Sequence, residues 1–213
     1  MTQAPTPDAE GLAEPLRSRW SPSVFDPAHT LGRDDVALLL EAARWAPSRG
    51  NSQPWALVVA PRGSAAHAAL VPHLSRGNSG WVPRASLVVL AGCRLDELKD
   101  TAHAPHAHHD LGQAVAHLTL QARAMGLHAH QFAGFDADAA AAALGVPDGV
   151  RLMTGVAVGA RGDAAEVPKR DAEREQRPRV RRPLEEVATG GPFGTPWDAP
   201  WTAGRMTGAD PQG

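Results

Sequence analysis

The sequence of 213 residues contains no tyrosine, a single cysteine and few aromatic residues, which make up 5% of the chain. With only Cys93 present, an intrachain disulfide and a thiolate-rich metal site are both excluded. Cys93 follows the apolar run 87–91, so we expect a thiol buried at the end of a strand rather than a nucleophile. The chemistry of this chain must therefore come from other residue types.

The chain also lacks a surplus of charge of either sign, because its formal net charge is −2. It has no basic patch of the kind that binds nucleic acid or an acidic membrane surface. No apolar run approaches the roughly 18 residues that span a bilayer. Residues 1–14 contain neither the basic nor the apolar region of a signal peptide. We therefore expect a cytoplasmic protein that binds neither nucleic acid nor membranes.

The hydrophobic pattern indicates one domain in which helices and strands alternate. Helical spacing of apolar residues predicts helices over 34–45, 65–74, 110–125 and 136–144, after a short helix within 15–20. Short valine-rich runs predict strands over 55–60, 86–91, 127–133 and 152–159. Asp34 or Asp35 can cap the first long helix, and Gly126 is placed to end the longest one in the left-handed conformation. No glycine-rich phosphate loop follows the first strand, which disfavours a doubly wound nucleotide-binding fold.

The same pattern divides the chain into a core and two ends. Residues 1–14 are predicted to form a flexible arm, 15–187 the folded domain, and 188–213 a C-terminal extension. Within the domain, 161–178 is charged, mixed in sign and without an apolar stripe, which predicts a mobile linker.

The most informative segment is Ala-Pro-Ser-Arg-Gly-Asn-Ser-Gln-Pro-Trp at 46–55, which joins a predicted helix to a predicted strand. Its prolines restrict the backbone, and its Ser, Asn and Gln side chains offer neutral donors and acceptors. Such a loop suits a planar heterocycle such as a flavin ring. The alternative is an ordinary turn with local capping bonds, since Asn, Ser and Gly favour turns.

This segment is similar to a pattern of the nitroreductase family, in which a helix ends in Ala-Pro-Ser and the chain continues through Asn-x-Gln-Pro-Trp into a strand. Further matches follow in the family's order: Arg-Trp-Ser-Pro-Ser at 19–23, Asp-Leu-Gly at 110–112, Gly-Phe-Asp at 134–136 and Arg-Val-Arg-Arg-Pro-Leu-Glu-Glu at 179–186. They span nearly the whole chain. The resemblance implies an α+β fold of three layers, with a central mixed, mostly antiparallel sheet flanked by helices, in a homodimer that exchanges C-terminal arms.

The resemblance also implies FMN, bound between two subunits. The residues that match the family's cofactor contacts are Arg19, Trp20, Ser21, Ser23, Asn51, Gln53, Asn78, Gln131, Phe132, Ala133, Gly134, Arg179 and Arg181. The arginines and Ser21 would hold the phosphate, whose charge of roughly −1.5 to −2 guanidinium groups can match. Asn51 and Gln53 would lie near the ring, Asn78 at its pyrimidine edge, and the backbone of 131–134 near flavin N5.

Three positions depart from the family pattern. Trp20, Ser23 and Trp81 stand where the family usually has basic residues. Fewer cations would therefore face the cofactor, which implies weaker retention of FMN or a changed redox poise.

The implied activity is ping-pong hydride transfer from NADH or NADPH through FMN to an electron-poor acceptor, such as a nitroaromatic compound or a quinone. No dedicated catalytic side chain is expected. One alternative is a protein that stores or senses FMN without turnover. A second is a metal-binding protein that uses the histidine tract, His103, His106, His108 and His109, with His128 and His130. The aromatic residues Phe193, Trp197 and Trp201 of the extension would form an arm across the partner subunit or a self-packed tail.

Overall fold

A computed structural model describes residues 11–96, 104–167, 169–191 and 193–197. The chain divides into two compact units, Met1–Arg177 and Pro178–Gly213. The division falls before the boundary expected at residues 187 and 188. None of the helices in the described part of the chain has the length and apolar character needed to cross a membrane.

The first unit is built on a four-stranded sheet with the order β1-β2-β4-β3. The strands are β1 (Trp55–Pro61), β2 (Leu87–Arg94), β3 (His128–Phe132) and β4 (Val150–Gly159). All four were predicted, with ends that differ by at most three residues. Every pair among these described strands is antiparallel, because β2 runs opposite to β1 and β4 runs opposite to both β2 and β3. The mixed sheet that we expected is therefore wrong for the described part of the chain.

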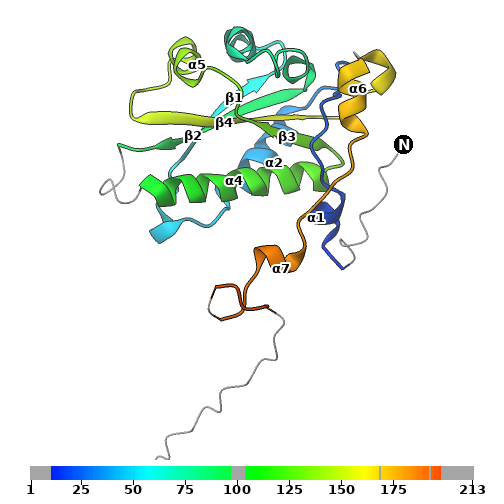
Figure 1. The fold of residues 1–213 in the computed structure, drawn as a ribbon. Helices are drawn as coiled ribbons and strands as arrows, with labels where there is room; N and C mark the ends of the chain where they lie inside the picture. Colours follow the sequence, from blue (N-terminus) through cyan, green and yellow to red (C-terminus); the bar gives the residue numbers. More distant parts are fainter. Residues whose placement is uncertain (1–10, 97–103, 168, 192, 198–213) are drawn as a thin grey trace, which may run out of the picture. The chain divides into compact units, whose positions relative to one another are not determined.

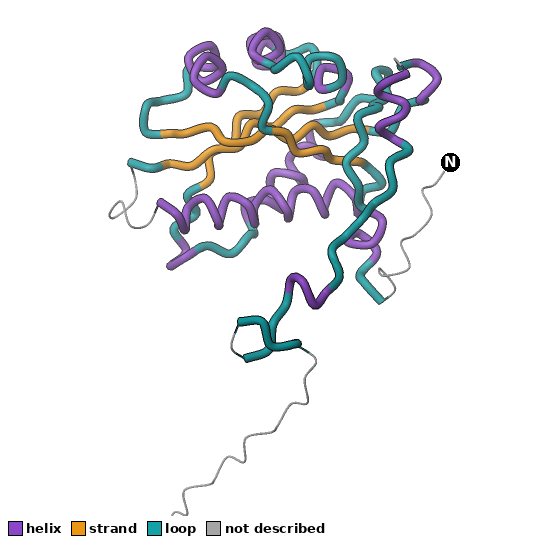
Figure 2. Tube along the Cα trace, in the orientation of Figure 1, coloured by secondary structure: helices purple, strands orange, loops and turns teal. Residues whose placement is uncertain are grey.

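Helices cover both faces of this sheet, which gives the first unit three layers (Figures 1 and 2). On one face lie α2 (Arg33–Arg44) and α4 (Ala104–Ala124), with α1 (Glu14–Ser18) beside α4. On the other lie α3 (Ala65–Leu70), which continues into the 3₁₀ turn Val71–His73, and α5 (Ala137–Leu144). Side chains alternate along the buried strand β2, so that Leu87 and Val89 face α4 while Val88 and Leu90 face α3 and α5.

The helix ends follow local chemistry. Asp136 accepts the N–H of Ala139 and caps α5, as expected. Gly126 has φ +78 after α4, and Leu127 packs into the core behind it, which confirms the predicted left-handed ending. The cap of α2 differs, because Gly32 is the N-cap and Asp35 accepts the Gly32 N–H from inside the first turn.

Two segments of charged or histidine-rich sequence contain more helix than expected. The helix predicted over 110–125 begins six residues earlier, as α4 at Ala104, since the alanines of this stretch favour a helix and Pro105 suits a first turn. The segment 161–178, predicted to be a mobile linker, contains the 3₁₀ turn Ala164–Glu166 and the helix α6 (Lys169–Glu175). Glu175 is buried in the first unit, and this tertiary contact explains the order of a segment without an apolar stripe.

The second unit contains the short helix α7 (Leu184–Val187) and an isolated β-bridge between Thr189 and Pro196. The aromatic side chain of Phe193 is almost fully exposed. Trp201, His103 and the first ten residues lie outside the described residues.

Candidate functional site

The loop from Ser48 to Gln53 connects α2 to β1 through the 3₁₀ turn Arg49–Asn51. Gly50, Asn51 and Gln53 all have positive φ, and the latter two are the only non-glycine residues with positive φ in the described part of the chain. Such a backbone costs about 1–3 kcal/mol per non-glycine residue and is typical of functional sites. Both side chains are exposed, so their amides are presented to solvent.

Asp110 of α4 anchors this loop. Its Oδ2 accepts the backbone N–H of Arg49 at 2.9 Å, and its side chain is almost fully buried. A second anchor is internal to the loop, where Ser48 Oγ accepts the Gln53 N–H at 3.0 Å. The conformation of the loop that carries Asn51 and Gln53 is therefore held by one bond to α4 and by one bond within the loop. Asp110 belongs to the Asp-Leu-Gly motif at 110–112, and nothing in the sequence indicates its bond to Arg49.

Asn78 and Gly134 lie together. Asn78 Nδ2 donates to the Gly134 carbonyl at 2.9 Å, and Ser75 N–H donates to the same oxygen at 2.9 Å. A Cβ on Gly134 would lie 2.6 Å from Ser75 Oγ and 2.7 Å from Asn78 Nδ2. Glycine is thus required here by the approach of the chain's own side chains, a reason that the sequence did not reveal.

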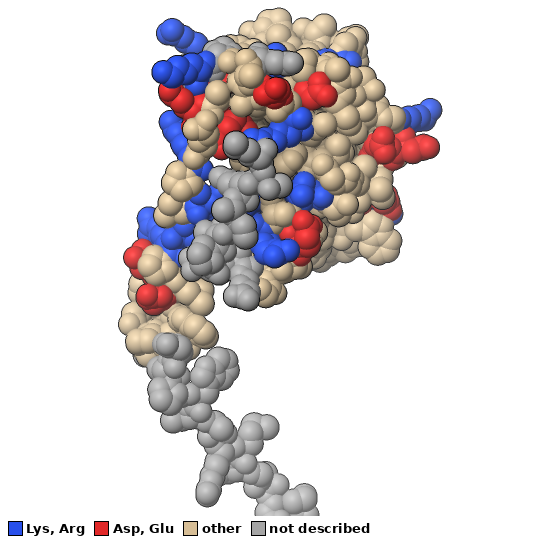
Figure 3. Space-filling model, turned by 90° about the vertical axis from the view of Figure 1, so that its right-hand side faces the viewer, with Lys and Arg blue, Asp and Glu red and all other residues tan. Residues whose placement is uncertain are grey.

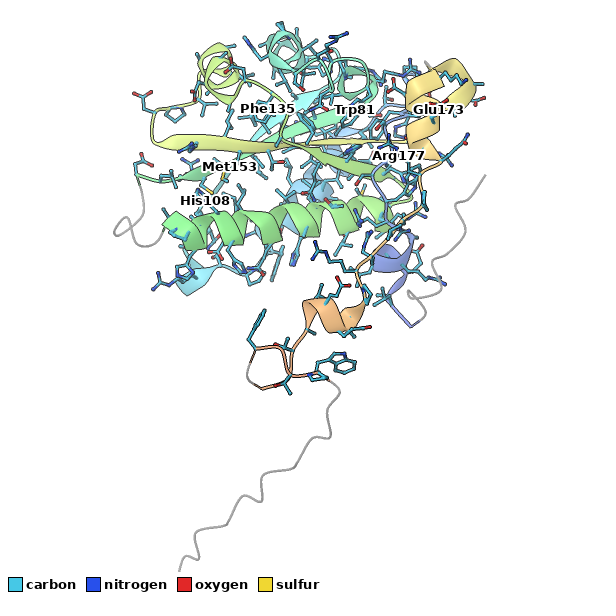
Figure 4. All side chains as sticks on the ribbon, in the orientation of Figure 1. Trp81, His108, Phe135, Met153, Glu173 and Arg177 are labelled. Atoms are coloured by element: carbon cyan, nitrogen blue, oxygen red, sulfur yellow. The ribbon has the colours of Figure 1, made fainter. Side chains whose placement is uncertain are left out.

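Trp81 bonds the oxygen of the Asn78 side-chain amide, whose nitrogen bonds Gly134. Its Nε1 donates to Asn78 Oδ1 at 3.2 Å and to the Gly77 carbonyl at 3.1 Å. The buried Trp81 ring stacks on His130 with centroids 4.2 Å apart and meets Phe132 edge to face. Figure 4 shows Trp81 and Phe135 in the layer between the sheet and the helices α3 and α5. The tryptophan at a usually basic position is therefore a core residue that orients Asn78.

The end of β3 leaves backbone donors unused. Gln131 turns towards α4, where its Nε2 donates to Thr119 Oγ1 at 3.1 Å, and Phe132 is buried. Beyond them, no hydrogen bond among the described residues uses the N–H of Ala133 or Gly134. These two amides are the groups for which the resemblance implies an approach to flavin N5.

The opening segment packs against the far end of β3 and β4. Trp20 meets His128 edge to face at 5.9 Å, and the Arg161 guanidinium lies 5.1 Å from the centre of the Trp20 ring. Ser21 is exposed, whereas Ser23 is buried and donates its N–H to the carboxylate of Glu175. Trp20, which stands at a usually basic position, thus contacts a cation from another part of the chain, Arg161, and the sequence did not indicate this contact.

Two guanidinium groups, Arg123 and Arg161, lie near His128 at this corner of the molecule. Burial, together with the nearby guanidinium groups of Arg123 and Arg161, lowers the pKa of His128 from 6.5 to about 4. Figure 3, which faces the side that carries α6, shows Lys and Arg side chains gathered there with acidic side chains beside them. Charges of both signs therefore lie on this side of the molecule.

The closing basic pair belongs to the second unit. Arg179 is half-buried, and Arg181 is exposed with its Nη1 donating to the Val180 carbonyl at 2.8 Å. Because the two units are described separately, the convergence of this pair upon Arg19 and Ser21 stays a prediction.

The other candidate chemistries find less support. In the part of the chain that the structure describes, no three His, Cys, Asp or Glu side chains are grouped to hold a metal ion. His109 Nδ1 lies 3.3 Å from Asp110 Oδ1, while His108 is a half-buried residue of α4 (Figure 4). Cys93 is buried as expected, with Sγ donating to the Ala107 carbonyl, and burial and Asp110 raise its pKa to about 11. A thiol in this state is unreactive.

Comparison with known proteins decides the family. The profile described as the nitroreductase family matches residues 16–80 and 66–160. The chain belongs to the nitroreductase family. The crystal structure of an oxidoreductase containing FMN has a TM-score of 0.81 and 35% identity, over 92% of this chain and 100% of that one.

Two further proteins are similar to this chain in sequence. A 15.4 kDa Mycolicibacterium smegmatis protein of uncharacterised function is 47% identical over 123 residues, which is 58% of this chain and 81% of that protein. The major NAD(P)H-flavin oxidoreductase of Aliivibrio fischeri is 41% identical over 44 residues, which is 21% of this chain and 20% of that protein. The antiparallel sheet with helices on both faces is thus the nitroreductase fold.

Proposed function

We propose that this nitroreductase-family protein is an FMN-dependent oxidoreductase that takes hydride from NADH or NADPH and passes it to an electron-poor acceptor, such as a quinone or a nitroaromatic compound. The FMN of the 35% identical structure supports the cofactor. The Aliivibrio fischeri relative supports a reduced nicotinamide as the donor. Because such donors are used inside the cell, we also propose a cytoplasmic location.

The conformation of the Ser48–Gln53 loop carries this proposal. Asn51 and Gln53 match the family's ring contacts, and among the residues that the structure describes they are also the two non-glycine residues with positive φ. Their exposed side-chain amides can donate and accept hydrogen bonds, as the edge of an isoalloxazine ring requires. Strain retained at an exposed loop, and fixed by a buried carboxylate, favours a binding role over an ordinary turn.

The residues present also fit the reacting end of FMN. When bound, FMN supplies the two-electron chemistry, and the protein supplies orientation and polarity. The unused N–H groups of Ala133 and Gly134 can donate to a ring nitrogen, and the Asn78 and Ser75 bonds fix the Gly134 peptide for this task. No side chain has to move a proton, because water can supply it.

One copy of the chain cannot complete this site. The Asn51 loop precedes Trp55, which pairs with Cys93 and, through it, with Arg151. Trp20 instead packs on His128, whose partner is Gly159. Positions 151 and 159 of β4 are eight residues apart, or about 26 Å at roughly 3.3 Å per residue. We therefore propose that the loop of one subunit and the opening segment of its partner enclose one FMN.

The surface formed by α2 and α4 supports a homodimer. An open apolar groove of about 470 Å³ lies between these helices, lined by residues that include Leu38, Trp45 and Leu120. Leu38 is 48% exposed and Trp45 71% exposed, which is unusual for large apolar side chains next to each other. The α2–α4 surface is continuous with the loop that follows α2, so a second copy docked there would reach it. The exchange of C-terminal arms stays part of this proposal.

A two-step absorbance experiment tests the proposed reaction. The FMN-loaded protein is mixed anaerobically with NADH or NADPH, and we expect the flavin band near 450 nm to bleach and then to return when a quinone or a nitroarene is added. Bound FMN that neither nicotinamide reduces would favour storage or sensing of flavin instead.

A further inference from the structure

A buried carboxylate occupies the opening segment of the candidate site. Glu175, the last residue of α6, accepts the backbone N–H of Ser23 at 2.5 Å across 152 positions of sequence. Its side chain is only 3% exposed. A carboxylate is costly to bury without partners that favour its charge. This corner of the first unit therefore holds a carboxyl group of the chain itself, in contact with a backbone N–H.

Arg161 supplies the matching charge. Its Nε lies 3.9 Å from Glu175 Oε2, and its guanidinium covers the ring of Trp20. The β-bridge between Phe25 and Arg161 fixes the backbone that carries this guanidinium beside the opening segment. The planar face of Trp20 holds the group by a cation–π contact. The residue that stands at a usually basic position thus positions a cation from another part of the chain.

Carboxylates and phosphate monoesters compete for the same kind of partner, since both accept N–H bonds and pair with guanidinium groups. The phosphate carries the larger charge, roughly −1.5 to −2 against −1. Two anions would repel each other if both lay against the Ser23 amide and Arg161. Only one of them can therefore occupy this position.

We propose that the Ser23 N–H and Arg161 form part of the phosphate-binding subsite for FMN, and that the Glu175 carboxylate competes with the phosphate for these two partners. Binding of the phosphate displaces the Glu175 carboxylate and releases the end of α6. This inference rests on the proposed FMN-dependent function. It adds Arg161 as a contact of the phosphate, Glu175 as a competitor of the phosphate, and α6 as a helix that changes when FMN binds. It also accounts for how a chain with Trp20 and Ser23 at usually basic positions can retain the cofactor.

The experiment compares FMN with riboflavin, which has the same ring and no phosphate. Dissociation constants are measured by quenching of flavin fluorescence for the wild type, E175Q, R161Q and the control E173Q. Glutamine keeps an oxygen that accepts the Ser23 N–H, so E175Q removes the charge and preserves the bond. Glu173 lies on the same helix, is 63% exposed and pairs only loosely with Lys169 at 3.8 Å, so it matches the charge change without the contact (Figure 4).

We expect E175Q to bind FMN about tenfold more tightly, which corresponds to about 1.4 kcal/mol, and R161Q to bind it about tenfold more weakly. Riboflavin affinity should be the same in all four proteins, and E173Q should match the wild type for both ligands. Hydrogen–deuterium exchange in 169–175 of the wild type should increase with FMN and remain unchanged with riboflavin.

Each contrary result has a distinct meaning. If the wild type binds FMN and E175Q binds it no more tightly, the competition is refuted while the proposed function stands. If exchange in α6 falls on FMN binding, Glu175 is a structural anchor and the displacement is wrong. If the wild type does not bind FMN at all, the proposed function fails and this inference fails with it.

Discussion

Replacement of Asp110 tests whether a buried carboxylate sets the geometry of the candidate flavin loop. In the wild type the N–H of Arg49 donates to Asp110 Oδ2 at 2.9 Å, and D110A removes this acceptor. A hydrogen bond to a charged group contributes about 1.5–3 kcal/mol, and a neutral one about 1 kcal/mol. We therefore expect D110A to lower the free energy of unfolding by about 2 kcal/mol and D110N, which keeps an acceptor oxygen, by about 1 kcal/mol.

The effect on FMN should follow, because a loop freed from Asp110 must be ordered again when the ring binds. We expect the dissociation constant for FMN to rise about tenfold in D110A, since this corresponds to about 1.4 kcal/mol of the lost anchoring. Thermal unfolding would show a loss of about 4–8 °C in Tm for a chain of this size. Asp138 is exposed in the first turn of α5 and provides the control, because D138A removes a carboxylate that anchors no loop.

Stability and FMN affinity, measured together, distinguish a loop that does not contact FMN from a loop that Asp110 does not hold. A D110A protein that loses stability but binds FMN as tightly as the wild type would show that the loop does not contact the cofactor. A D110A protein that matches D138A in both measurements would show that the bond to Arg49 does not hold the loop.

Four further predictions concern other parts of the molecule. G134A should lower the free energy of unfolding by about 1–3 kcal/mol, because the added Cβ would lie 2.6 Å from a side-chain atom. G112A should raise it by about 0.5–1 kcal/mol, because the added Cβ on the exposed side of α4 would meet no atom within 4 Å and a glycine is removed from a helix. Equal effects of the two variants in chemical unfolding would contradict this. The pKa of His128 is about 4 in the folded protein, below its ordinary value of 6.5. The unfolded chain therefore binds the proton at a higher pH than the folded protein does, and stability should fall as the pH drops from about 6.5 towards 4. An H128L protein should show a smaller loss of Tm over that range. Cys93, with its raised pKa, should react with a thiol reagent only after unfolding, and fast labelling of the native protein would show that it is accessible. W45E places a charge on the α2–α4 surface and should shift sedimentation towards the monomer, whereas an unchanged dimer would place the interface elsewhere.

The parts of the fold that sequence could predict are those with a local signal. Apolar periodicity predicted the four strands and the positions of α2, α3 and α5, because the spacing of apolar residues within each element indicates which of its faces is buried. The ending of α4 at Gly126 was equally predictable, since a left-handed residue after a helix needs little beyond local geometry.

The parts that sequence could not predict depend on contacts between distant residues. The helix α6 has no apolar stripe, and its order comes with the contact between Glu175 and Ser23, 152 positions away. The role of Trp20 depends on Arg161 from beyond β4, and that of Trp81 on the amide of Asn78. In the candidate site, motifs named Asn51 and Gln53, but only the structure showed the anchor at Asp110 that holds them.

The central claim is that two copies of this chain enclose FMN. Its most direct test is a titration of the cofactor-free protein with FMN, followed by flavin absorbance, with the mass of the loaded species measured by sedimentation. We expect saturation at one FMN per chain on a species of two chains. Saturable binding of one FMN to a monomer, or no saturable binding at all, would contradict the account.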